Sequence, residues 1–166
     1  MKKVLIVLLF ILYNVTGKIN DISQLLEKTR TELLVIIEPS IPKDMREKKT
    51  VSHYTQTPSQ KLTSHEASSL WILAQKNKKY INEEQIALER MYKLCASATI
   101  AEYILLLLTC LYIQKKQYQS AVDVLSVFIK LFPGSQYYKE ARILYIQALF
   151  ELCLTYEYDL ESIKET

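Results

Sequence analysis

Histidine, the residue most often used as a metal ligand or general base, occurs only twice in this chain. His53 and His65 lie in a polar stretch, and no cysteine or carboxylate stands beside them at zinc-ligand spacing. The sequence also lacks the GxGxxG, GxxxxGKS/T, HExxH and GxSxG motifs of nucleotide, zinc and hydrolase sites. We therefore expect no metal, no cofactor, no small-molecule substrate and no catalytic residue.

The three cysteines are the remaining candidates for nucleophilic or redox chemistry. Cys95, Cys110 and Cys153 are far apart and all fall in apolar stretches. A catalytic thiol needs a nearby histidine or another positive group, whereas apolar surroundings raise the pKa of a thiol. We expect these cysteines to be small core residues. A disulfide stays the alternative, because spacing alone does not supply bridging geometry.

The acidic residues show no paired acid–base arrangement. Glu83 and Glu84, and likewise Glu157, Asp159 and Glu161, are most simply helix N-terminal or surface charges. The chain has 21 basic and 18 acidic residues, and part of the net charge of +3 lies at the extreme N-terminus. A nucleic-acid binder would be more strongly basic. We therefore expect a protein partner and no nucleic acid.

The elements that hold these residues are expected to be helices. Only two glycines occur among 166 residues, and 49% of the residues are apolar. Few glycines leave few positions for tight hairpins, whereas leucine, lysine, glutamate and glutamine favour helices. One all-α domain of ordinary size follows from these numbers.

The N-terminus has the pattern of a secretory signal peptide. Positive charge at Lys2 and Lys3 is followed by the apolar segment Val4–Tyr13, and small residues then permit cleavage after Gly17. We expect residues 1–17 to be removed, with an uncleaved membrane anchor as the alternative. No cysteine follows the apolar segment, so we expect no attached lipid.

Two further segments precede the main domain. Residues 18–38 form an expected amphipathic helix, with its apolar residues at helical spacing from Ile22 to Ile37. Residues 39–64 contain three prolines and many polar residues, which indicates a flexible linker. The main helical domain is then expected over residues 65–166.

An internal repeat runs through this domain. Ala67, Trp71 and Ala74 are followed 34 positions later by Ala101, Leu105 and Leu108, the period of stacked helix–turn–helix units. About two and a half repeats are predicted, with helices near 65–79, 83–97, 100–115, 118–131, 136–153 and 156–165. The residues expected to pack the repeats together are Trp71, Ala87, Leu105, Leu108, Tyr112, Ala121, Phe128, Pro133, Ala141 and Tyr145.

The first helix of each repeat should line a concave groove. Its predicted partner-binding residues are Ile72, Lys76, Tyr103, Leu106, Ile113, Ile146 and Phe150. The segment 100–115 is apolar all round, which predicts burial on both sides. A partner's amphipathic helix or this chain's own Ile22–Ile37 is expected to cover the groove. A membrane span over Lys93–Lys115 is the alternative, but Glu102 in its interior argues against it.

The segment Tyr118–Leu152 resembles the tetratricopeptide-repeat (TPR) superfamily. Its Y-x-x-A…F…F-P-x-S…E-A pattern is similar to the bacterial envelope type represented by BamD and the Tol–Pal coordination protein. The matching positions are Tyr118, Ala121, Phe128, Phe132, Pro133, Ser135 and Ala141. The resemblance implies a non-catalytic scaffold or adaptor in the periplasm or at the periplasmic face of the outer membrane. Its implied role is outer-membrane protein assembly, with a structural subunit of cell-wall, division or secretion machinery as the alternative. Any membrane association would then run through partners or an uncleaved N-terminal anchor.

Overall fold

The computed structural model describes residues 22–42, 62–75, 80–95 and 97–164, with side chains up to Tyr156. These residues form six α-helices and a short 3-10 helix, η1, at Glu38–Ser40. The six helices are α2 (Ile22–Ile37), α5 (Ser64–Gln75), α6 (Ile81–Leu94), α7 (Ala98–Gln114), α8 (Tyr118–Leu131) and α9 (Tyr138–Lys164).

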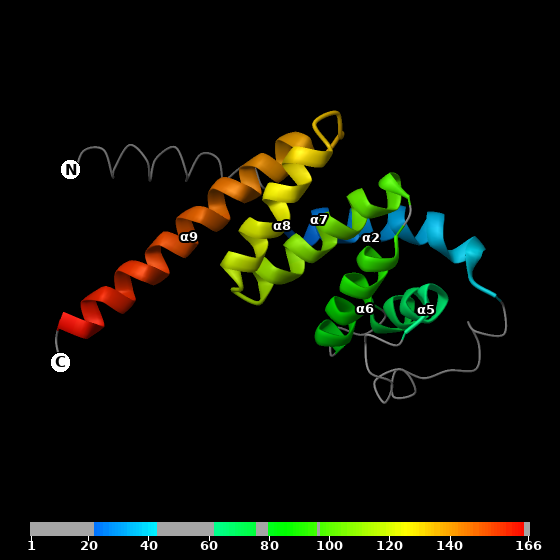
Figure 1. The fold of residues 1–166 in the computed structure, drawn as a ribbon, viewed down its shortest axis with the longest axis horizontal. Helices are drawn as coiled ribbons and strands as arrows, with labels where there is room; N and C mark the ends of the chain where they lie inside the picture. Colours follow the sequence, from blue (N-terminus) through cyan, green and yellow to red (C-terminus); the bar gives the residue numbers. More distant parts are fainter. Residues whose placement is uncertain (1–21, 43–61, 76–79, 96, 165–166) are drawn as a thin grey trace.

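Helices α5 to α9 form a stack in which each helix packs on the next one along the chain (Figure 1). The connections between them are short, as expected for antiparallel neighbours in a helical repeat. No strand occurs in the parts of the chain that the structure describes. The predicted fold class is therefore confirmed: the chain is an all-α, helical-repeat-like stack.

Local sequence explains where several helices begin and end. Thr63 and Glu66 form a capping box before α5: the backbone N–H of Thr63 donates to the Glu66 carboxylate at 3.0 Å, and the Thr63 hydroxyl accepts from the backbone N–H of Glu66 at 3.3 Å. The Ser97 hydroxyl accepts from the backbone N–H of Ile100 and caps α7. Helix α8 ends at Leu131, ahead of Pro133, because a proline cannot continue the backbone hydrogen bonds of a helix.

Helix α7 is the centre of the molecule. Every residue from Ile104 to Leu111 is buried, because α7 lies between two apolar clusters. One cluster joins α7 to α2, α5 and α6, and includes Leu107. The other joins α7 to α8 and α9, and includes Leu106. The all-apolar segment is thus a core helix. Among the described residues, no helix is both long and apolar enough to cross a membrane.

The break predicted between the last two helices is absent. The helices expected at 136–153 and 156–165 are one continuous helix, α9, because no glycine or proline interrupts it. At 27 residues it is about 40 Å long, and its C-terminal part extends beyond the stack in Figure 1.

The predicted linker is not free at its ends. Ile41 and Leu62 are buried in the same cluster as α2 and α5, and the Arg90 side chain donates to the Leu62 carbonyl at 2.8 Å. Residues 43–61 of this linker and the predicted signal peptide, residues 1–17, lie outside the described residues.

Candidate functional site

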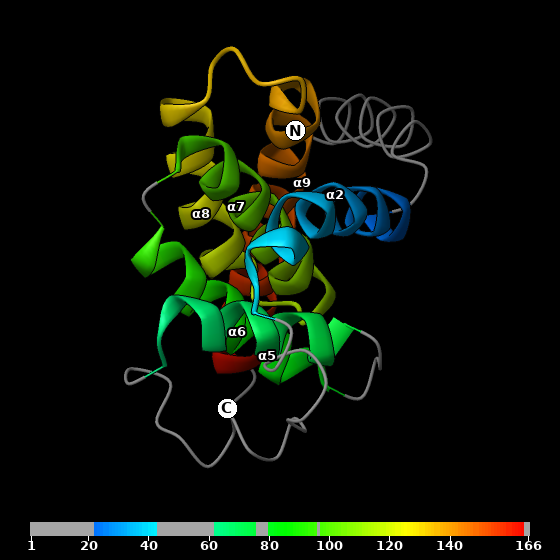
Figure 2. The same cartoon turned by 90° about the vertical axis from the view of Figure 1, so that its right-hand side faces the viewer.

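Helix α2 is far from α7 in the sequence but packs directly on it (Figures 1 and 2). Its buried positions are Leu26, Thr29, Leu33 and Ile37, which recur at the spacing of one helical face. The Thr29 hydroxyl donates to the carbonyl of Leu25 within the same helix, so its burial leaves no polar group unpaired. The segment Ile22–Ile37 therefore covers one face of α7.

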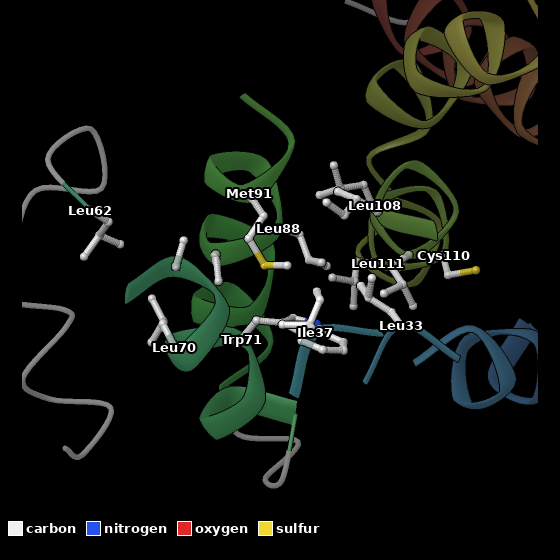
Figure 3. Close-up of a cluster of buried hydrophobic side chains, with 14 of the residues drawn as sticks. Leu33, Ile37, Leu62, Leu70, Trp71, Leu88, Met91, Leu108, Cys110 and Leu111 are labelled. Carbon is white, nitrogen blue, oxygen red and sulfur yellow. The ribbon is translucent and has the colours of Figure 1, made fainter. Parts of the chain in front are cut away.

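The apolar contact is deepest at the C-terminal half of α2. Figure 3 shows Ile37 beside Trp71 of α5, and Leu33 close to Leu111 of α7. Each of these four side chains is at most 4% exposed. Full burial of a leucine or isoleucine contributes about 1.5–3 kcal/mol, so α2 contributes substantially to the core.

A buried ion pair joins α2 to α6. Two nitrogens of the Arg30 guanidinium donate to the Glu84 carboxylate: Nε to Oε1 at 2.9 Å, and Nη2 to Oε2. The Glu84 side chain is only 3% exposed, and that of Arg30 is 13% exposed. Arg30 Nη1 also donates to Glu27 at 2.6 Å within α2. Two parallel bonds between a guanidinium and a carboxylate fix geometry as well as charge.

A second polar contact joins α2 to the turn before α9. The buried Tyr137 hydroxyl donates to the Glu32 carboxylate, and the Lys28 ammonium lies 4.9 Å from the centre of the Tyr137 ring. Tyr103 of α7 packs edge-on against the same ring, with ring centres 6.2 Å apart. The ring of Tyr137 is therefore held by α7 on one side and by two side chains of α2.

These contacts change the acidity of the groups involved. Burial and the bond to Glu32 raise the pKa of Tyr137 well above its ordinary value. Burial lowers the pKa of Arg30, but the bonds to Glu84 and Glu27 outweigh it, and the net pKa of the guanidinium is raised. Burial raises the pKa of the Cys110 thiol to about 12. Arg30 therefore stays charged and Cys110 stays a protonated, unreactive thiol at neutral pH.

We name the surface beneath α2 the α2 site and define it by Glu84, Cys110, Leu111 and Tyr137. Two helices, α6 and α7, and the turn before α9 contribute to it, and it combines an apolar floor with one buried carboxylate and one buried hydroxyl. Such a surface accepts an amphipathic helix that carries a cation and an acceptor at fixed positions.

The predicted groove residues are not all in one place. Leu106 and Ile113 are buried in the cluster with α8 and α9, whereas Ile72 and Tyr103 are half-buried at the edge of the α2 cluster. Ile146 is 54% exposed. Phe150 is half-buried on the same helix, and Lys76 lies outside the described residues. Among the described groove residues, Ile146 of α9 is the exposed one.

The predicted repeat-packing residues lie mostly inside the stack. Six of them, Trp71, Ala87, Leu105, Leu108, Ala121 and Phe128, are buried, as is Ala141 at the start of α9. Tyr112 and Tyr145 are half-buried, and the Tyr112 hydroxyl donates to Glu89 at 2.8 Å. Pro133 is exposed in the turn that follows α8.

Sequence reasoning missed the polar residues of the α2 site. Glu84 was expected to be a surface or helix-terminal charge; it is in the first turn of α6, yet it is buried against Arg30. A signal was present in the sequence. Arg30 follows Leu26 by four positions and precedes Leu33 by three, so it lies on the apolar face of its helix. A charge at such a position requires a buried partner.

A pocket outside the α2 site is open to solvent. A pocket of about 410 Å³ lies over α7 between α6 and α8, with Tyr92, Tyr112 and Val124 among its lining residues.

All three cysteines are free thiols, and Cys153 on α9 is exposed. Within the described part of the chain, no group of three or more histidine, cysteine or acidic residues could hold a metal ion.

The fold and the α2 site together define this protein as an all-helical, repeat-like stack with an amphipathic helix packed on its central helix. No protein-family model, curated protein or solved structure matches the chain.

Proposed function

We propose that this chain is a non-catalytic, exported TPR-type scaffold that binds protein partners in the bacterial cell envelope and serves outer-membrane protein assembly. The observation that carries the proposal is the packing of α2 on α7. A helix from a distant part of the sequence lies on the central helix of a stack, which is how helical-repeat scaffolds bind amphipathic helices.

The surface of α9 supports a role in partner binding. Ile143, Ile146, Phe150 and Leu154 follow one another at helical spacing, and none of them belongs to either apolar cluster. Terminal helices of repeat stacks ordinarily present a polar outer face to water. An apolar outer stripe on the last helix is typical of a surface that another protein covers.

The proposed location rests on the sequence. The charged and apolar segments of residues 1–17 have the pattern of an export signal, and the Tyr118–Leu152 motif is similar to envelope TPR proteins. We predict that the mature chain begins at Lys18 and carries no lipid. Intact-mass measurement of the protein from its native host tests this, and an N-terminus at Met1 or a lipid adduct would contradict it.

Affinity capture from an envelope extract tests the proposed function. The tagged full chain should retain a component of the outer-membrane barrel-assembly machinery. Ile146→Asp should lose that component, because the change places a charge in the exposed apolar stripe. Gln136→Asp, in the exposed turn before α9, is the matched control and should retain it.

The other outcomes are equally informative. Capture of division, cell-wall or secretion components would favour the structural-subunit alternative. Equal capture by the Ile146→Asp and wild-type chains would show that the partner binds elsewhere than on α9. Absence of any envelope protein would contradict the proposal.

A further inference from the structure

Among the helices that the structure describes, α2 differs from the others in how it is attached to the stack. The connections within α5–α9 are short turns, whereas α2 and α5 are separated by the long segment that contains residues 43–61. Helix α2 can therefore leave α7 without breaking a turn of the stack. Its departure would uncover Cys110 and Leu111 and leave the Glu84 carboxylate without its cation.

The α2 site is selective because of what it buries. An apolar helix would leave the Glu84 carboxylate and the Tyr137 hydroxyl unpaired in a dry interface. A helix that replaces α2 must instead place a guanidinium over Glu84 and a carboxylate against Tyr137. The required order is that of α2 itself: Leu26-x3-Arg30-x-Glu32-Leu33-x3-Ile37.

We infer that the α2 site is exchangeable: α2 occupies it in the free chain, and a partner helix with the pattern Leu-x3-Arg-x-Glu-Leu-x3-Ile displaces α2 to bind there. This inference deepens the proposed scaffold function by naming the chemistry of the helix that is bound. Charge complementarity carries it, since the Glu84 carboxylate accepts from the Arg30 guanidinium of α2 and the Tyr137 hydroxyl donates to the Glu32 carboxylate of α2. Helix α2 is thus an internal competitor that lowers the apparent affinity for the partner.

The exchange can be measured on the full chain with a labelled peptide of residues 22–41 as the probe of the partner helix. Arg30→Ala in the chain weakens the resident α2, so the wild-type peptide should bind that variant at least tenfold more tightly than it binds the wild-type chain. Val35→Ala is the matched control, because Val35 is on α2 but 69% exposed, and it should leave peptide affinity unchanged.

A second experiment tests the ion pair between Arg30 of the bound helix and Glu84 of the α2 site. A peptide carrying Arg30→Ala should bind the Arg30→Ala chain at least tenfold more weakly than the wild-type peptide does. Adding Glu84→Gln to the chain should remove most of that difference, because the two changes act on the same ion pair. A peptide that binds neither chain, or an undiminished difference with Glu84→Gln, would overturn the inference.

Hydrogen exchange on the wild-type chain keeps the test decisive where Arg30→Ala fails to fold. The amides of α2 should exchange through an opening that leaves α7 and α8 protected. Exchange of α2 only together with α7, at the free energy of global unfolding, would make α2 a permanent part of the core and overturn the inference. Transfer of α2 between two copies of the chain would assign the site to self-association and not to a partner.

The peptide experiment and the envelope capture can fail independently, so their results distinguish the α2 site from the proposed function. Peptide exchange without envelope capture would keep the α2 site and reject the proposed location. Envelope capture without peptide exchange would keep the scaffold and reject the α2 site as its binding surface.

Discussion

At the scale of single residues, the ion pair between Arg30 and Glu84 is the contact whose disruption should cost the most stability. It places a charge on the apolar face of α2 and another inside the first turn of α6, 54 positions away. A buried pair of this kind adds little over a well-packed apolar pair, but removal of one member leaves a charge without compensation. Its main effect is to specify which helix can lie on α7.

We predict that Glu84→Gln lowers the free energy of unfolding by about 3 kcal/mol, the lower end for a broken buried pair, because Glu27 still neutralises Arg30. Glu83→Gln, one residue earlier and less buried, should change it by less than about 0.5 kcal/mol. Urea unfolding of both variants measures the difference. Equal losses for the two would show that Glu84 is not buried against Arg30.

At the scale of elements, the turn between α7 and α8 shows how backbone geometry sets the packing of the stack. Lys116 has φ of 57°, the only positive φ at a non-glycine residue in the described segments. Its N–H donates to the Ile113 carbonyl at 3.0 Å, and the Gln117 N–H donates to the Tyr112 carbonyl at 2.8 Å. These two bonds form a Schellman motif, which ends α7 and turns the chain directly into α8.

Glycine should fit this turn better than lysine. We predict that Lys116→Gly raises the free energy of unfolding by about 0.5–1 kcal/mol, because a left-handed conformation carries no Cβ penalty in glycine. Gln117→Gly is the control: its φ is −88°, so glycine there should lower stability by a similar amount. Thermal unfolding of both variants tests this, and a loss of stability with Lys116→Gly would refute the turn geometry.

At the scale of the whole molecule, α7 links both halves of the core. It belongs to the cluster with α2, α5 and α6 and to the cluster with α8 and α9. Several groups with raised pKa values, Cys110, Tyr112 and Tyr137, lie on α7 or touch the helices that flank it. Stability against alkaline pH is therefore a property of the assembled stack.

We predict that the chain loses stability above about pH 9. The pKa of Cys110 rises from 9.0 to about 12 on folding, so the unfolded chain releases this proton first and stability falls between these values. One such proton lowers the free energy of unfolding by about 1.4 kcal/mol per pH unit. Burial and hydrogen bonds raise the pKa values of Tyr112 and Tyr137 in the same direction, and they add to the loss above pH 10.

Urea unfolding followed by circular dichroism at pH 8, 9, 10 and 11 measures this slope. Cys110→Val removes the thiol with little change in volume, so its stability should fall less steeply between pH 9 and 10. An identical slope in the variant and the wild type would show that Cys110 does not ionise differently in the folded chain.

The sequence by itself determined the helical fold class and the central position of α7. Both follow from local patterns: scarce glycine, a helical repeat and a segment without a polar face, which must be buried on all sides. The segment Ile22–Ile37 was also foreseeable as a helix. The sequence did not decide whether this segment or a partner covers α7. An amphipathic pattern predicts that one face of a helix is buried, but it does not identify the surface against which that face packs.

Only the tertiary structure decided the α2 site. Arg30 meets Glu84, and Glu32 meets Tyr137, across 54 and 105 positions of sequence. No periodic pattern encodes such pairs, since they depend on the angle at which α2 crosses the stack. The buried ends of the predicted linker were decided in the same way. Ile41 and Leu62 look like isolated apolar residues in a polar stretch, and only the packed core provides a place for them.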